Sequence, residues 1–217
     1  MSVFGKDPGA ARIKFAPYVN TFAAYLLTFC VFCLLGAALW NGISVDPGAA
    51  GIISGAADRL RTDSGDAVSA ALSGALFPAS LIAVAFAAGP TTYSPAIGFL
   101  GSLFYGLREG LSLGLRFRLV SMGLSPGALL SDAFFELAAV PAVMAAFSFC
   151  CRLCLRKMSA SGRRPALFGG SLFCFGPSRF PDLRFIFTYL AFFVLFEIPV
   201  YLISFVRIGV ISLILFH

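Results

Sequence analysis

Residues Ser94–Cys151 read SPAIGFLGSLFYGLREGLSLGLRFRLVSMGLSPGALLSDAFFELAAVPAVMAAFSFCC. This stretch contains two apolar runs of membrane-spanning length, joined by a short loop. Charged residues lie inside both runs: Arg108 and Glu109 in the first, and Glu136 in the second. A charge at membrane depth is costly and usually marks a pairing or functional site. These two segments are therefore the centre of the predicted fold.

The composition indicates an integral membrane protein. The chain has 217 residues, of which 59% are hydrophobic and 12% are charged. Soluble domains are about 45–50% apolar and about 25% charged. Because each membrane crossing uses about 20 residues, several crossings leave no segment for a separate soluble enzyme domain. We expect a single all-α domain over residues 1–217, a polytopic transmembrane helix bundle of about five spans.

Breaks between the apolar runs predict where the spans lie. A glycine–proline pair at residues 89–90 ends the second run. The last apolar stretch has about thirty residues, more than one span needs, and it is interrupted by Pro199 and Arg207. We interpret it as a span to about Val206, followed by an apolar tail along the interface. The predicted spans are residues 20–40, 71–88, 95–115, 129–154 and 185–206.

Two polar segments set the predicted orientation. Residues 41–70 are acidic and carry apolar residues at helical spacing, which favours an external amphipathic helix on the membrane surface. Residues 155–183 form a basic loop, which is typical of the cytoplasmic side and not of a nucleic-acid site. We therefore expect a cytoplasmic N-terminus and an external C-terminus. Arg116 and Arg118 would then lie outside, against the general rule.

The residue types argue against an enzyme and against a metal or cofactor site. Cys30 and Cys33 lie in one apolar run, three more cysteines lie at residues 150–154, and the single histidine is His217. A metal site would need a further cluster of Cys or His residues as ligands. The cysteines are better interpreted as small apolar packing residues. The chain also lacks a serine–histidine pair, an HExxH motif and a phosphate loop. We expect no catalytic residues.

The charges inside the predicted spans are expected to meet in the outer half of the bilayer. With a rise of ~1.5 Å per residue, Arg108 lies roughly 20 Å and Glu197 roughly 18 Å above the inner end of its span. Glu136 lies in the outer third. We predict that Arg108 pairs with Glu136 or Glu197 and so joins spans three, four and five, with Glu109 facing a neighbouring helix or the outer water. The pairs either stabilise the bundle alone or border a docking groove or polar path.

Glycines and prolines mark the helix contacts and breaks near these charges. Gly106, Gly110 and Gly114 are expected at a helix-packing surface of the third span. Pro141 and Pro199 are expected to loosen the fourth and fifth spans, because proline frees a backbone carbonyl that a polar neighbour must satisfy.

The order of these motifs resembles the stage II sporulation protein M family of bacterial membrane proteins over about residues 15–210. The resemblance is carried by three segments: FYGLREGLSLGLRF (Phe104–Phe117), MGLSPGALL (Met122–Leu130) and FFELAAVPAV (Phe134–Val143). It implies a non-enzymatic multi-pass component of the bacterial cell membrane. Such a protein anchors peptidoglycan hydrolases and other septal membrane proteins, and it supports engulfment of the forespore during sporulation.

Two further functions remain open at this stage. A small transporter or transporter subunit would use Arg108, Glu136 and Glu197 to line a substrate or proton path. A subunit of a larger membrane complex would use its basic loop to dock a cytoplasmic ATPase. Nothing in the sequence fixes an oligomeric state.

Overall fold

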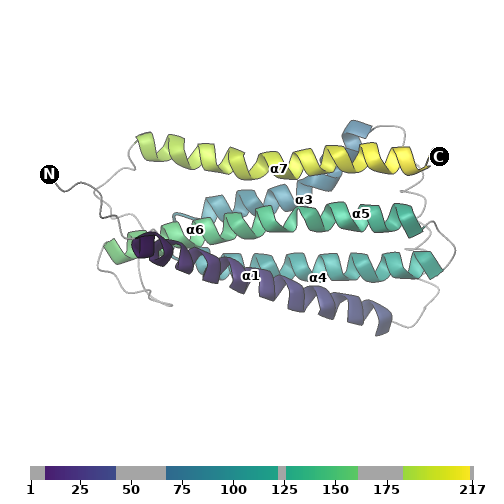
Figure 1. Ribbon diagram of the computed structural model, residues 1–217, viewed down its shortest axis with the longest axis horizontal. Helices are drawn as coiled ribbons and strands as arrows, with labels where there is room; N and C mark the ends of the chain where they lie inside the picture. The colour runs from purple at the N-terminus through teal and green to yellow at the C-terminus, as the bar shows by residue number, and fades with distance from the viewer. Residues whose placement is uncertain (1–7, 43–66, 122–125, 161–182, 216–217) are drawn as a thin grey trace.

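The computed structural model of the chain describes residues 8–42, 67–121, 126–160 and 183–215. These residues form helices that run roughly along one common axis (Figure 1). The prediction of an all-α fold is confirmed for this part of the chain. The helices are α1 (Pro8–Gly42), α3 (Ala67–Ala88), α4 (Ser94–Ser121), α5 (Pro126–Ala138), α6 (Val140–Ala160) and α7 (Leu183–Leu215).

Consecutive passes along the bundle alternate in direction (Figure 1). The turn between α3 and α4 is closed by Thr91, whose backbone N–H and hydroxyl both donate to the carbonyl of Ala88, at 2.8 and 2.7 Å. α1 packs along α4, and α3 packs along α7. The residues of α1 nearest Pro8 and those of α7 nearest Leu215 lie at opposite ends of the bundle.

α6 is the central helix, and it contacts α1, α3, α4 and α7. Its side chains form the middle of the hydrophobic core, where Val143, Met144 and Phe147 are almost completely buried. Half of the apolar segment that includes α6 is buried, against 6% of the corresponding segment of α7. The apolar surface of α7 is therefore turned outward.

The contact between α1 and α4 depends on glycine. Gly106, Gly110 and Gly114 recur every fourth residue along α4 and face α1. A Cβ at Gly114 would lie 2.7 Å from the Cβ of Trp40, and one at Gly106 or Gly110 would collide with a backbone carbonyl oxygen of α1. Gly36 of α1 lies equally close to the α4 backbone, since a Cβ added at Gly36 would lie 2.6 Å from a carbonyl oxygen of α4. Small residues at this spacing let helix backbones approach closely in a membrane.

The two prolines act differently. The predicted fourth span is divided into α5 and α6 at Ala139, two residues before Pro141. Pro141 has no N–H to donate to the carbonyl of Leu137, four residues earlier. At this division the N–H of Ala139 donates to the carbonyl three residues earlier, that of Glu136, at 3.3 Å. Pro199, in contrast, lies inside α7, which continues as one helix to Leu215, past the predicted end of the span.

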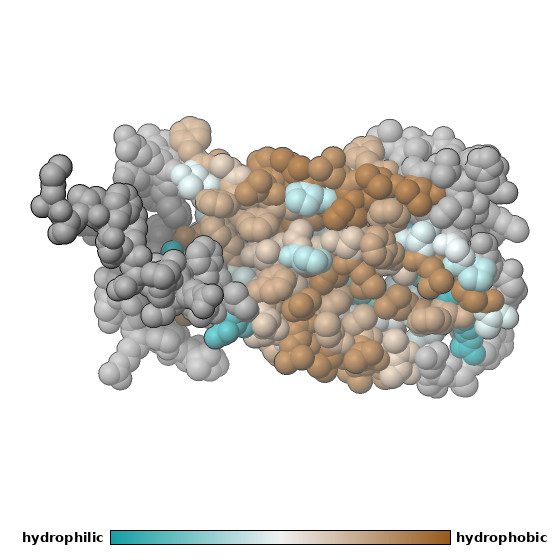
Figure 2. Space-filling view, viewed as in Figure 1, coloured by the Kyte–Doolittle hydropathy of each residue, from teal (hydrophilic) through white to brown (hydrophobic). Residues whose placement is uncertain are grey.

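Within the described residues, three apolar segments are long enough to cross a membrane: Asn20–Trp40, Leu129–Arg156 and Ile186–Arg207. They coincide with three of the five predicted spans. Over the second predicted span, the part of α3 whose side chains are described is the apolar segment Gly74–Ala88. α4 is long but is interrupted by charges. The count of five spans is therefore not confirmed. A broad hydrophobic band covers the middle of the visible face, as expected for a membrane protein (Figure 2).

Some predicted features lie outside the described residues. Residues 43–66 hold most of the predicted external segment, and residues 161–182 hold most of the predicted basic loop. Cys174 and His217 also lie outside. The expectations about these residues stay predictions.

Candidate functional site: a charge network between α4, α5 and α7

Four charged side chains from three helices form what we call the charge network: Arg116 of α4, Asp132 and Glu136 of α5, and Arg207 of α7. Nη2 of Arg116 lies 2.7 Å from Oδ2 of Asp132 and 2.6 Å from Oε2 of Glu136. Nη2 of Arg207 lies 2.5 Å from Oδ1 of Asp132 and 3.3 Å from Oε1 of Glu136. Each arginine therefore bridges both carboxylates.

The spacing of the two acids explains how one cluster joins three helices. Asp132 and Glu136 are four residues apart, so they lie on the same face of α5, one turn from each other. That helix packs against both α4 and α7, and each neighbour contributes one arginine. Arginine suits this position because its planar group can donate several hydrogen bonds at once. Arg207 shows this directly, since its Nε also donates to Oδ1 of Asp132, at 2.6 Å.

The charge network is largely buried and electrically balanced. Its side chains are between 5% and 19% exposed. Two arginines face two carboxylates, so the formal charges cancel. A buried ion pair adds little net stability over apolar packing, but removing one partner leaves an uncompensated charge at a cost of about 3–5 kcal/mol. The arrangement therefore fixes how α4, α5 and α7 sit against one another.

A second ion pair lies beside the charge network. Arg108 pairs with its sequence neighbour Glu109, and its guanidinium lies over the ring of Phe77, 4.4 Å from the ring centre. Arg108 is 44% exposed, whereas Glu109 is 1% exposed. Oε2 of Glu109 is buried and has no basic or hydroxyl donor among the described residues, and the side chain lies beside another acid, Glu136 of the charge network. Glu109 is thus the most deeply buried charge of the site, and only one of its carboxylate oxygens pairs with a basic group.

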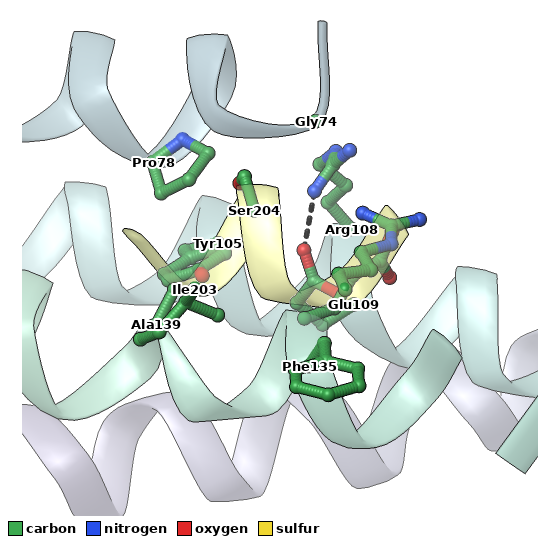
Figure 3. Close-up of a pocket in the computed structure, with 11 residues that line it drawn as sticks. Gly74, Pro78, Tyr105, Arg108, Glu109, Phe135, Ala139, Ile203 and Ser204 are labelled. Atoms are coloured by element: carbon green, nitrogen blue, oxygen red, sulfur yellow. Dashed lines mark hydrogen bonds and ion pairs between the residues drawn. The ribbon is translucent and has the colours of Figure 1, made fainter. Parts of the chain in front are cut away.

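A small cavity is lined by residues of this pair and of the charge network, including Glu136 and Arg207. Its wall includes Tyr105, Arg108, Glu109 and Phe135, which Figure 3 shows with other lining residues from α3 and α7. The cavity volume is about 10 Å³. A cavity needs about 10–15 Å³ on this measure to hold one water molecule. The cavity therefore suits one water molecule, and a larger solute does not fit.

The structure brings together only part of the predicted polar cluster. The predicted pairing of Arg108 with Glu136 or Glu197 is wrong. Glu136 pairs with Arg116 and Arg207 instead, and Arg108 contacts the residue next to it. The reason is the level of the groups along α4: Arg116 lies two turns beyond Arg108, and it is this turn that faces the acids of α5.

Three members of the charge network were not among the predicted site residues: Arg116, Asp132 and Arg207. Two signals in the sequence point to Asp132 and Arg116. Asp132 and Glu136 have the four-residue spacing of a single helix face. Arg116 is a positive charge that the orientation rule places on the wrong side, and such an exception is explained if the side chain is paired inside the bundle.

Glu197 lies apart, in what we call the α3–α7 groove. This groove has a volume of about 540 Å³. Oε2 of Glu197 is buried and has no hydrogen-bond partner within the described part of the chain. The groove is lined by Leu76, Ala79, Ser80 and Ala83 of α3 and by Phe193, Val194, Glu197, Ile198 and Tyr201 of α7.

No protein-family model matches the chain, and no curated protein or solved structure matches it. The role of the charge network must therefore be inferred from its own residues. Beside them stands the resemblance of Phe104–Phe117 and Phe134–Val143 to the stage II sporulation protein M family, which stays a prediction.

Proposed function

We propose that this chain is a non-enzymatic membrane scaffold that resembles stage II sporulation protein M. In this proposal it crosses the bacterial cell membrane several times, with a cytoplasmic N-terminus and an external C-terminus. It holds peptidoglycan-remodelling partners at the septal membrane during sporulation. Its bundle provides a rigid frame, and its outward surface provides the contacts with those partners.

The observation that carries this proposal is the mutual pairing of the buried charges. Arg116 and Arg207 each bridge Asp132 and Glu136, so the charge network joins helices to one another. A transport path needs polar groups that are free to bind a solute, and the cavity beside the network holds only about 10 Å³. Charges used in this way support a structural role.

The outward surface supports the second half of the proposal. Large apolar side chains are exposed along α1 and α7, including Leu34 at 73% and Phe187 at 70%. In a membrane these surfaces face lipid or other helices. A scaffold with a stable interior and an open apolar surface can bind membrane segments of partners without changing its own fold.

The test compares partner capture with solute uptake. A tagged chain is expected to recover peptidoglycan hydrolases from solubilised native membranes. The matched control is Gly110→Leu, which disturbs the α1–α4 contact and should lower the recovery. A deletion strain is expected to show normal uptake of small solutes. Recovery of no wall enzyme by the intact chain would contradict the proposal.

A small transporter or transporter subunit is the second candidate, and Glu109 is the observation that favours it. This carboxylate is 1% exposed beside the cavity and has one oxygen without a basic or hydroxyl donor among the described residues. Such a group inside a membrane is a candidate proton carrier. A transporter predicts that deletion lowers the uptake of a solute and that Glu109→Gln fails to restore it. A scaffold predicts normal uptake in both strains.

A further inference from the structure

The α3–α7 groove combines apolar walls with one unsatisfied carboxylate. Leu76, Val194 and Ile198 are 66%, 51% and 48% exposed along its walls. Its volume of about 540 Å³ lies within the range of about 300–1,000 Å³ in which proteins bind ligands. An apolar groove of this size on the outside of a bundle is suited to a hydrophobic occupant.

Glu197 makes the groove chemically incomplete. The buried Oε2 has no donor among the described residues. The nearest hydroxyl candidate on α3 is already used, because Ser80 donates to the carbonyl of Phe77 at 2.7 Å. Arg108 of α4 and Arg207 of α7 pair elsewhere: Arg108 with Glu109, and Arg207 with Asp132 and Glu136. A carboxylate at membrane depth without a partner is costly.

The shape of the groove favours a helix over a lipid chain. Ser80 and Ala83 are exposed and three residues apart on α3, so they form a small-residue surface on which another helix can pack closely. An acyl chain would fill the apolar space, but it has no group that can donate a hydrogen bond to Glu197. A helix can both fill the apolar space and donate a hydrogen bond to Glu197.

We propose that the α3–α7 groove binds a transmembrane helix of a partner protein, and that this helix carries a lysine or arginine that pairs with Glu197. The inference rests on the proposed scaffold function, since it names the surface and the chemistry through which one partner is held. The partner helix packs its small or apolar face against Ser80 and Ala83, and its basic side chain donates a hydrogen bond to the carboxylate of Glu197.

Photocrosslinking in native membranes tests this inference. A photoreactive amino acid is placed at Leu76 or Val194 in the groove and, as a control, at Phe104, which is 59% exposed on α4 and lies outside the groove. The groove positions are expected to crosslink to a transmembrane segment that carries a lysine or arginine, and the control position is not. Glu197→Leu should lower the crosslink yield about tenfold, because the free energy of one polar contact in a membrane corresponds to a change of about this size in a binding equilibrium.

A charge swap makes the result specific. Glu197→Lys should abolish the crosslink, and a glutamate in place of the partner's basic residue should restore it. Crosslinks that reach only lipid, or only a second copy of this chain, overturn the inference, and so does a yield that Glu197→Leu leaves unchanged. If hydrolases are still recovered while the groove crosslinks fail, the groove assignment is wrong and the scaffold function stands. If neither is seen, both fail.

Discussion

Replacing Arg207 by methionine should destabilise the bundle strongly. Arg207 contacts Asp132 at 2.5 Å and Glu136 at 3.3 Å, and it is 19% exposed. Its loss leaves two buried carboxylates facing one arginine, so the network gains a net negative charge. Removing one partner of a buried ion pair costs about 3–5 kcal/mol. That corresponds to a shift of roughly a hundredfold to several thousandfold in the folding equilibrium.

A compensated variant separates the charge imbalance from the loss of contacts. Replacing all four members by apolar residues of similar size removes every charge of the network together. Buried ion pairs replaced in this way are often neutral, or stabilised by about 1–4 kcal/mol. We expect this variant to be clearly more stable than the single one. The substitutions are Arg116→Met, Asp132→Leu, Glu136→Met and Arg207→Met.

The assay is unfolding by sodium dodecyl sulfate in mixed micelles, followed by far-ultraviolet circular dichroism. Phe205→Met is the matched control, because Phe205 is on the same helix and is 49% exposed, so its loss should change the unfolding free energy little. Two results would refute the reasoning. One is an Arg207→Met variant as stable as the wild type, and the other is a four-fold variant no more stable than the single one.

Two further predictions concern the packing of the bundle. Gly110→Leu should separate α1 from α4, because even a Cβ at this position collides with the carbonyl oxygen of Cys33. The fluorescence emission of the single tryptophan, on α1, should then shift to the red, whereas Ala38→Leu at an exposed position should leave the emission unchanged. An unchanged emission spectrum in both variants would contradict the close contact. Met144→Ala should lower the unfolding free energy by about 2–5 kcal/mol, because Met144 is completely buried. Leu34→Ala, at an exposed position, should have a small effect. Equal losses of unfolding free energy in the two variants would show that the core is not centred on α6.

Periodic features of the sequence were the most predictable part of the fold. The four-residue spacing of Gly106, Gly110 and Gly114 is a local property, and it puts the three residues on one face of any helix that contains them. The structure adds the identity of the partner helix, α1, which no spacing can give. The apolar character of residues 20–40, 129–154 and 185–206 likewise follows from composition along the chain.

The charged contacts were less predictable, because they depend on how helices rotate and slide against each other. Counting residues gave the depth of Arg108 and Glu197 but not the direction in which each side chain points. Arg108 therefore had a plausible partner in Glu136, although Arg116, two turns away, occupies that position. The division at Ala139 also follows from one proline, whereas Pro199 leaves α7 helical. Proline thus divides one helix and leaves the other continuous.

The most direct test of the scaffold account is partner capture by the four-fold apolar variant described above. The tagged wild type and the variant are compared at equal abundance in native membranes, and the recovered peptidoglycan hydrolases are quantified by mass spectrometry. If the charges serve only to hold the bundle together, both proteins recover the same hydrolases in similar amounts. Loss of capture by a stably folded variant, together with loss of uptake of a solute, would contradict the account and assign the charges to a transport path.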